Sequence, residues 1–192
     1  MDKKKKLIII ISSIAAVLVA TGIILAIELG GNKGKNENTV EMMVANSEKT
    51  IATATADVSV TDGGIKVLGY KQIVEIGEGE TVIREITAEL NSTQELKEKE
   101  TVQTVTEYNR DNLITFSFEE FMYKTYNYSD GTLTATVSKD RVDNVLGYNL
   151  VANSDGTLTA KFENSLIKEF TFTFTMEDGK VLTMVSTYQY KA

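Results

Sequence analysis

Apolar and polar residues alternate with a period of two through most of the chain after Ile51. Successive side chains of a β-strand point to opposite faces of the sheet, so this period indicates strands with one apolar face. Asp-Gly and Gly-rich turn signals separate the alternating runs, as they do in hairpins. The chain is therefore predicted to be α+β and mainly β, built around an antiparallel sheet.

The first half of this sheet is predicted as a meander. Strands are expected at 51–60, 65–76 and 81–90, with turns at 62–64 and 77–79, and further strands at 101–108 and 112–116. The heptapeptide Ser-Asp-Gly-Thr-Leu-Thr-Ala occurs at 129–135 and again at 154–160. Each copy is interpreted as a hairpin turn followed by a strand, because Asp-Gly favours two-residue turns.

Three short helical segments are predicted among the strands. Asn38 and Glu41 have the spacing of a helix start, and apolar residues then follow with helical spacing. A second helix is expected over 138–147, with Gly147 as its C-terminal stop. The stretch 117–125 fits either a helical turn or a long bent strand, and its capping box favours the helical turn.

The last hairpin is the strongest local signal. Phenylalanine and methionine alternate with threonine from 170 to 176, and Asp178-Gly179 predicts a two-residue type I′ turn. That turn places Phe174 opposite Thr183. The Phe face would then gain Val181 and Val185, and the Thr face would gain Leu182, Met184, Tyr188 and Tyr190. Neither face is then plainly polar, so the sheet is either covered on both sides or leaves one face free for a ligand or partner.

The N-terminus has the pattern of a single-pass membrane anchor. Residues 1–6 include four lysines, and 7–27 form a run of 21 residues without a charged side chain. A helix of that length spans roughly 30 Å, enough to cross a bilayer. The positive-inside rule makes 1–6 a cytoplasmic basic tail and 7–29 a transmembrane anchor. The predicted localisation is the cell membrane, with an extracytoplasmic C-terminal domain.

A cleaved signal peptide is the competing interpretation of this N-terminus, because Ala20 and Gly22 have a spacing that signal peptidase accepts. The apolar run continues past that site, which favours the anchor. Residues 30–38 contain three glycines and no apolar side chain, and they predict a flexible tether. The remainder, 39–192, is then the extracytoplasmic β-rich domain.

Composition removes several classes of function. The chain contains no His, Cys, Pro or Trp, which excludes a catalytic triad, a zinc hydrolase and a lipidated cysteine. The residues after Leu29 include 16 Lys and Arg against 25 Asp and Glu, a net charge of −9. An acidic domain repels phosphate backbones, so nucleic-acid binding is disfavoured. No cofactor is expected.

No catalytic or metal-binding residue is predicted. The acidic pairs Glu119–Glu120 and Asp140–Asp143 fall in helix-capping positions, and the Asp-Gly sites lack the spacing of a calcium loop. Tyr and Met are typical of recognition surfaces, because Tyr is amphipathic and Met is adaptable. Placement at the edge of the core, with the hydroxyls in water, is the plainer interpretation of each tyrosine. The candidate ligand or partner contacts are Tyr123, Tyr126, Tyr128, Met184, Tyr188 and Tyr190.

The order of these elements resembles one known family. The chain has, in order, an anchor, a tether, a helix leading into a Ser/Thr-rich strand, a meander, a small helix at 138–147 and the hairpin FTFTFTMEDGKVLTMVSTYQY. This order resembles that of the LolA-type lipoprotein carriers and related anchored lipoproteins. The resemblance covers roughly 39–192 and is architectural. It implies a half-barrel, a curved sheet that holds acyl chains beneath short helices. The chain departs from the family in lacking a lipidated cysteine and in placing Thr at many alternating positions.

Three functions follow from these features. The leading hypothesis is a non-enzymatic, membrane-anchored binding module for a lipid or other amphiphile. The alternative is a structural or protein-interaction domain at the cell surface, working through a sheet edge or a Tyr patch. An enzyme is the third, and it would require a carboxylate or Lys with a perturbed pKa inside a cleft.

Overall fold

The computed structural model describes residues 35–91, 93, 95–148 and 150–191. The predicted cytoplasmic tail at 1–6, the predicted anchor at 7–29 and residues 30–34 of the predicted tether lie outside this range. Among the described residues, no helix is long and apolar enough to cross a membrane.

The described chain begins with a helix and continues with strands. Helix α2 spans Lys35–Thr50, so it starts earlier than the expected helix and includes the end of the expected tether. The strands are β1 Ile51–Asp62, β2 Ile65–Ile76, β3 Thr81–Leu90, β4 Leu96–Val105, β5 Tyr123–Ser129, β6 Thr132–Val137, β7 Gly156–Glu163, β8 Leu166–Thr175 and β9 Val181–Tyr190. The short helices are η1 Arg110–Asn112, η2 Glu120–Met122, η3 Lys139–Arg141 and α3 Val142–Leu146.

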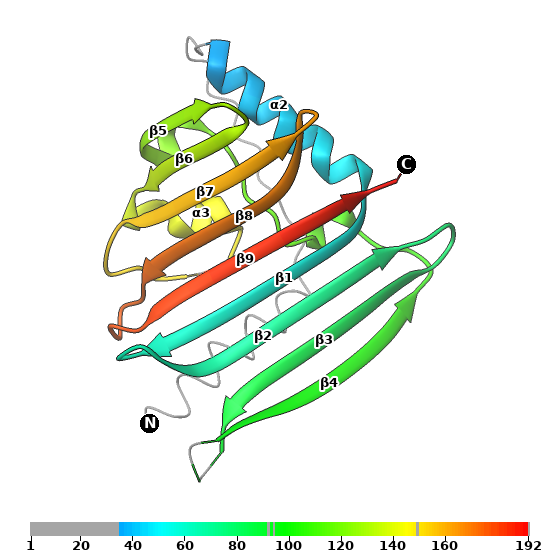
Figure 1. Ribbon diagram of the computed structural model, residues 1–192, viewed down its shortest axis with the longest axis vertical. Helices are drawn as coiled ribbons and strands as arrows, with labels where there is room; N and C mark the ends of the chain where they lie inside the picture. The colour runs from blue at the N-terminus through cyan, green and yellow to red at the C-terminus, as the bar shows by residue number, and fades with distance from the viewer. Residues whose placement is uncertain (1–34, 92, 94, 149, 192) are drawn as a thin grey trace.

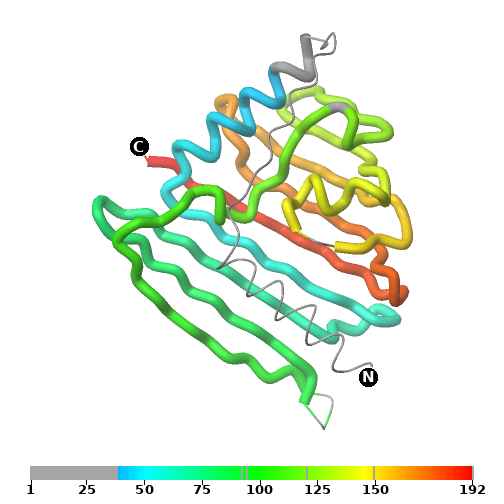
Figure 2. The backbone as a smooth tube through the Cα atoms, turned by 180° about the vertical axis from the view of Figure 1, so that it is seen from behind, coloured from blue at the N-terminus to red at the C-terminus, as the bar shows by residue number. Residues whose placement is uncertain are grey.

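All nine strands form one antiparallel sheet, in the order β4-β3-β2-β1-β9-β8-β7-β6-β5. The first strand therefore pairs with the last, which brings the two ends of the domain together at the centre of the sheet (Figure 1). The sheet is curved, and α2, α3 and the connecting segment after β4 lie on one side of it (Figure 2). The predicted mainly-β antiparallel fold with short helices is confirmed.

The two faces of the sheet differ sharply in composition. The inner face, on the side of α3, carries buried apolar residues such as Val58, Leu158 and Phe172. The outer face carries threonines in register across adjacent strands, including the row Thr136, Thr157, Thr173, Thr183. Burial of the inner apolar side chains is the main stabilising contribution of the sheet.

The register of the β8–β9 hairpin corrects the sequence expectation. Thr175 lies opposite Val181, and Phe174 lies opposite Leu182 instead of Thr183. The backbone N–H of Met176 donates to the carbonyl of Lys180, and Gly179 has a φ of 83°. The loop therefore has three residues, with Gly179 in the left-handed conformation that such loops require. The extra residue reverses the face of every β9 side chain relative to the expectation.

This reversal separates apolar from polar residues along β9. Leu182, Met184 and Tyr188 join the phenylalanines on the inner face, where all three are buried. Val181 and Val185 join the threonines on the outer face. The expectation that neither face is polar was wrong, because it rested on the two-residue turn.

Two other local expectations were wrong. Residues 112–116 form no strand, because Asn112 ends η1 and 113–116 belong to an irregular connection. The second heptapeptide copy, at 154–160, is not a hairpin turn: Asp155 accepts a bond of 3.1 Å from the Lys139 backbone N–H and one of 2.7 Å from Lys124 Nζ. The first copy does form the β5–β6 turn. The helix expected over 138–147 is confirmed as η3 and α3, with Gly147 left-handed at a φ of 68°.

A crossing segment, residues 106–122, connects β4 at one edge of the sheet to β5 at the other. Nine strands are roughly 38 Å wide, and the segment is long enough to cover that distance. It contributes Leu113, Ile114, Phe116 and Phe118 to the core, all buried. The helical turn favoured at 117–125 is limited to η2, after which β5 begins at Tyr123.

The crossing segment and the helices cover only part of the inner face. Helix α2 packs against β8, and α3 lies behind β7 and β8 as seen in Figure 1. Strand β4, at the far edge, is exposed at every residue except Val105. Its alternating charges, Lys97, Glu98, Lys99 and Glu100, are typical of an edge protected against pairing with another chain.

Candidate functional site

The six predicted contact residues all lie on the inner face, in two groups. Tyr123, Tyr126 and Tyr128 belong to β5, whereas Met184, Tyr188 and Tyr190 belong to β9. Three strands separate β5 from β9, so the structure does not bring the six residues together. Tyr123, Met184 and Tyr188 are buried, and the other three are half-buried.

Several of these tyrosines hold backbone segments in place. The hydroxyl of Tyr188 donates to the carbonyl of Ile114, and that of Tyr123 donates to the carbonyl of Ser117 at 2.7 Å. Both acceptors belong to the crossing segment. The Tyr190 hydroxyl donates to the carbonyl of Ile167 on β8. These bonds satisfy polar groups in the interior and fix the crossing segment over the sheet.

The β5 group is packed by aromatic contacts. The ring of Phe118 stacks on Tyr123 with centroids 4.8 Å apart and meets Tyr126 edge-on at 5.3 Å. Tyr128 meets Phe162 edge-on at 5.7 Å, and its hydroxyl donates to Met43 Sδ of α2 at 3.8 Å. Each of these three tyrosines therefore has a packing role in the described chain.

A different set of residues forms a polar cluster on the inner face of β2 and β3. The Tyr70 hydroxyl donates to Glu85 Oε1 at 2.6 Å. Gln72 Nε2 donates to the Tyr70 oxygen at 3.2 Å and to Glu85 Oε1 at 3.4 Å. Tyr70 and Gln72 are buried, and Glu85 is half-buried. A carboxylate thus sits on a face that is otherwise mainly apolar.

Two further tyrosines complete this cluster from outside the sheet. Tyr108 lies on the crossing segment and Tyr148 follows α3, and both pack against the core. Burial raises the pKa of Tyr70 well above its usual range, and the nearby Glu85 charge and Tyr148 raise it further. Burial also raises the pKa of Tyr108. The positive charge of Arg110 lowers that pKa, and the negative charge of Glu85 raises it. Glu85 therefore raises the pKa of both Tyr70 and Tyr108, although of these two only Tyr70 is hydrogen-bonded to it.

The Tyr108 hydroxyl has an unusual environment. Its oxygen is buried, and within the described part of the chain it has no hydrogen-bond partner. A buried hydroxyl without a partner costs about 1–3 kcal/mol. Such a group therefore marks a position where an additional polar molecule would be stabilised.

Apolar residues adjoin the cluster on the same face. Leu68 and Val74 on β2 and Ile83 on β3 alternate in phase with Tyr70, Gln72 and Glu85, and all three are buried. We define Tyr70, Gln72, Glu85, Tyr108 and Tyr148 together as the tyrosine–glutamate cluster. Its position beside apolar residues gives this part of the inner face both a polar and an apolar component.

The sequence analysis missed the tyrosine–glutamate cluster. Two of its members nevertheless have a detectable signal: Gln72 and Glu85 occupy the apolar phase of their strands, where a polar residue is unexpected. Tyr108 and Tyr148 have no such signal, because they lie in connections whose paths depend on the tertiary fold.

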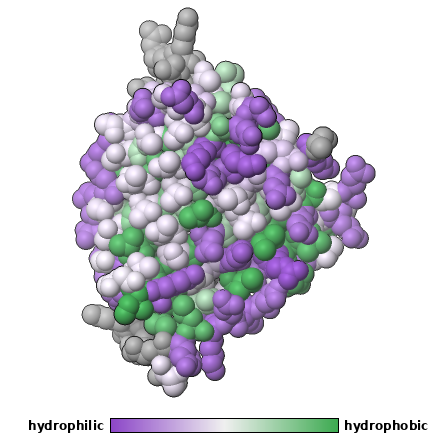
Figure 3. Space-filling model, in the orientation of Figure 1, coloured by the Kyte–Doolittle hydropathy of each residue, from purple (hydrophilic) through white to green (hydrophobic). Residues whose placement is uncertain are grey.

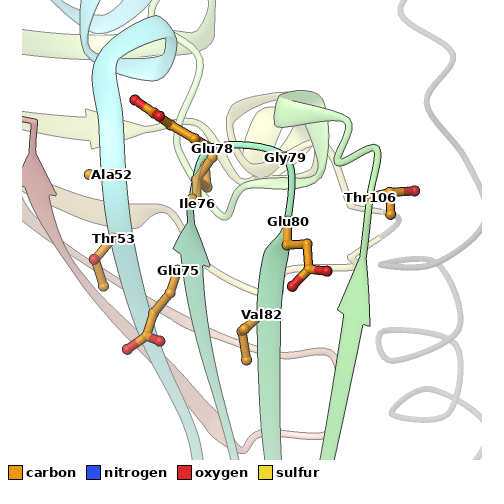
Figure 4. Close-up of a pocket in the computed structure, with 10 residues that line it drawn as sticks. Ala52, Thr53, Glu75, Ile76, Glu78, Gly79, Glu80, Val82 and Thr106 are labelled. Atoms are coloured by element: carbon orange, nitrogen blue, oxygen red, sulfur yellow. The ribbon is translucent and has the colours of Figure 1, made fainter.

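An open hollow lies at the end of the β2–β3 hairpin (Figure 4). It has a volume of about 760 Å³ and is lined by residues that include Thr53, Glu75, Glu80 and Val82. Its glutamates are exposed, and the described residues contain no cluster of three or more groups suited to a metal ion. Within the described residues, the hollow therefore lacks the converging ligands of a metal site.

The rest of the outer face is broad and of intermediate hydropathy (Figure 3). Threonines dominate β6–β9, whereas charged pairs such as Asp57 opposite Lys71 occur over β1–β4. Most of these threonines are half-buried by one another, and Thr173 Oγ1 donates to Thr183 Oγ1 at 3.3 Å. This face offers hydroxyls and methyl groups, most of them on exposed or half-buried side chains.

Comparisons with known proteins identify no family. No protein-family model matches the chain, and no curated protein matches it. Among solved structures, LprF from Mycobacterium bovis is 10% identical, with 84% of this chain and 97% of LprF covered and a TM-score of 0.43. A CurJ dehydratase is 7% identical, with 82% of each chain covered and a TM-score of 0.19. The tesB protein of Mycobacterium avium subs. paratuberculosis is 9% identical, with 80% and 85% covered and a TM-score of 0.16. At these identities and scores, the likenesses carry no functional argument.

Proposed function

We propose that the protein is a non-enzymatic binding module that holds an amphiphile on the inner face of its sheet. The observation that supports this is the tyrosine–glutamate cluster beside Leu68, Val74 and Ile83. An amphiphile requires a polar group and apolar side chains next to each other. Both are present here, but Leu68, Val74 and Ile83 are at most 7% exposed, so the proposal requires this part of the inner face to open before an alkyl chain reaches them. A concave sheet with short helices on one side is also the architecture that the LolA-type resemblance implies.

The module is further proposed to be anchored in the membrane through 7–29, with its β domain on the extracytoplasmic side. The four lysines before the apolar run support this orientation. The chain has no native Cys, so a single introduced one can report its position. A Thr134→Cys variant, on the exposed outer face of β6, should react with a membrane-impermeant maleimide in intact cells. A Lys3→Cys variant should react only after the cells are lysed, and the reverse pattern would overturn the orientation.

Photo-crosslinking tests amphiphile binding on the full chain in its membrane. A diazirine-bearing alkyl probe should label the inner face of β3 at Ile83 more than the outer face at Ile86, as mapped by peptide mass spectrometry. The two isoleucines lie on the same strand and opposite faces, and Ile83 is the more buried, so stronger labelling of Ile83 cannot come from simple exposure. Labelling confined to 7–27 would show insertion of the probe into the bilayer without binding to the domain.

A protein-interaction role remains the second candidate, because one observation favours it. The described helices lie on the inner side of the sheet (Figure 2), and the outer face presents threonines in register over four strands. This role predicts that substitutions such as Thr159→Lys abolish capture of a partner while leaving probe labelling at Ile83 unchanged.

A further inference from the structure

The crossing segment consists of two parts that differ in how firmly they are held. Residues 113–122 contribute most of their apolar side chains to the core. Two of their carbonyls accept hydrogen bonds from Tyr188 and Tyr123, and the Ser117 N–H donates to the carbonyl of Val145 at 2.8 Å. Local opening of a folded chain begins where few buried contacts are lost, so this part is expected to stay in place.

Residues 106–112, which we call the gate segment, are less buried. Thr106, Glu107 and Asn109 are exposed, whereas Tyr108 is half-buried and packs against the core. The Tyr108 hydroxyl oxygen is buried and has no hydrogen-bond partner among the described residues. Burial of this oxygen is unfavourable, so it offsets part of the stabilisation that the Tyr108 ring provides.

The gate segment runs along one end of the sheet, on the side of the inner face (Figure 2). Val105, just before it, lies opposite Thr81 at the start of β3, and Arg110 is bonded to Ile51 at the start of β1. Between these points the segment passes the ends of β3 and β2, a distance of roughly 14 Å that a few extended residues can span. Val74 and Ile83 lie opposite each other near this end of the two strands. The gate segment therefore borders the inner face beside them.

One side chain attaches the far end of the gate segment. Arg110 Nη1 donates to the carbonyls of Glu48 and Ile51, at 2.9 Å each. Glu48 belongs to the last turn of α2, where carbonyls have no donor within the helix, so Arg110 also satisfies the helix end. Within the described part of the chain, the hydrogen bonds from the gate segment to α2 and β1 come from Arg110 alone. We call this pair of bonds the latch.

We propose that the gate segment is a lid on the inner face, which opens when the Arg110 latch is released while 113–122 stays packed. Opening withdraws the Tyr108 ring and gives access to the inner face beside Val74 and Ile83. This inference rests on the proposed function and adds the route by which an alkyl chain reaches these buried side chains. Binding that requires opening is weakened by the small fraction of open molecules, so a weaker latch should strengthen binding.

Two single-tryptophan reporters test the opening itself, because the chain has no native Trp. Tyr108→Trp places one reporter in the gate segment, and Phe116→Trp places the other in the part that stays packed. Arg110→Met, made in each reporter of the full chain in detergent micelles, keeps the apolar stem and removes both hydrogen bonds. It should shift the emission of the reporter at 108 to longer wavelength and increase its quenching by acrylamide, and it should leave the reporter at 116 unchanged.

A matched arginine substitution controls for loss of charge. Arg84 is exposed on the outer face of β3, where it pairs with Glu100. Arg84→Met should change neither reporter. An unchanged reporter at 108 in Arg110→Met would overturn the latch, and a shift at both reporters would overturn an opening limited to the gate segment.

Photo-crosslinking tests whether the opening is the route for an alkyl chain. The full chain in its membrane, without the tryptophan reporters, is labelled with the diazirine-bearing alkyl probe at a subsaturating concentration, and labelling of 7–27 serves as the internal reference. Arg110→Met should raise labelling at Ile83 about tenfold, as expected for the loss of two hydrogen bonds that hold the closed state. Labelling at Ile86, on the outer face, should not change.

The two measurements separate this inference from the proposed function. If Ile83 is labelled equally in Arg110→Met and the unmodified chain, the gate segment is not the route, and amphiphile binding stands. If Ile83 is labelled in neither, the proposed function and the entry route both fail, and the reporter at 108 alone decides whether the latch holds the segment.

Discussion

The buried hydroxyl of Ser47 joins α2 to β8, 120 residues away in the sequence. Its oxygen accepts a hydrogen bond of 2.8 Å from the backbone N–H of Ile167 and donates one of 2.6 Å to the carbonyl of Met43. The first of these bonds satisfies a main-chain donor where β8 begins. It therefore fixes the position of the helix relative to the sheet.

Replacement of Ser47 by Ala should lower the free energy of unfolding by about 1–3 kcal/mol, because the Ile167 N–H would remain buried without an acceptor. Thr50→Ala is the matched control, since the Thr50 hydroxyl bonds only to carbonyls of its own helix and is more exposed. That variant should change stability by less than about 0.5 kcal/mol. Urea unfolding followed by circular dichroism measures both, and equal losses would contradict the role assigned to Ser47.

Alkaline pH should unfold the protein cooperatively. Burial raises the pKa of six tyrosines above the ordinary value, namely Tyr70, Tyr108, Tyr123, Tyr148, Tyr188 and Tyr190. In the unfolded chain each ionises near pH 10, so above that pH the unfolded state releases protons that the folded state keeps. Stability is therefore fully present below pH 10 and falls as the pH rises, by about 1.4 kcal/mol per pH unit for each tyrosine.

Tyrosinate absorbance and circular dichroism should change together in this alkaline titration, because ionisation of these residues requires unfolding. Tyr148→Phe removes one of the protons released on unfolding. The free energy of unfolding should then fall less steeply with pH, by about 1.4 kcal/mol per pH unit. A full tyrosinate signal in a chain that remains folded would show that the hydroxyls are accessible to solvent.

The register of β9 can be tested by substituting two adjacent residues. Met184 is 3% exposed on the inner face, whereas Val185 is 38% exposed on the outer face. Met184→Lys should cost more than about 4 kcal/mol or prevent folding, because it buries an unpaired charge. Val185→Lys should cost less than about 1 kcal/mol. The two-residue turn expected from Asp178-Gly179 predicts the opposite order.

The local elements of the fold could be predicted because their signals are local. Period-two alternation and glycine turns placed the strands 65–76 and 81–90 at the bounds of β2 and β3. The register of the last hairpin could not be predicted in the same way, because it depends on whether the turn has two residues or three. Only the packing of Leu182 and Met184 against the phenylalanines selects the three-residue turn.

The candidate site could not be predicted from local sequence patterns, for a different reason. Its members come from β2, β3, the crossing segment and the connection after α3. They meet only because β4 and β5 lie at opposite edges, which forces 106–122 across the inner face. The tyrosines chosen from composition lie in the same layer, but Tyr123 and Tyr188 are bonded to the crossing segment. Their proposed contact with a ligand remains a prediction.

Tyr70 and Tyr108 should respond oppositely to loss of the hydroxyl. Tyr108→Phe removes a buried oxygen that has no partner among the described residues, so the ligand-free protein should become more stable by about 1–2 kcal/mol. Tyr70→Phe removes the hydroxyl that donates to Glu85 and accepts from the Gln72 amide. This variant should lower the free energy of unfolding by about 1–3 kcal/mol. Thermal unfolding without added amphiphile measures both variants. A loss of stability in Tyr108→Phe would mean that its hydroxyl already has a partner in the intact protein, and the cluster would then have no vacant position for a head group beside that residue.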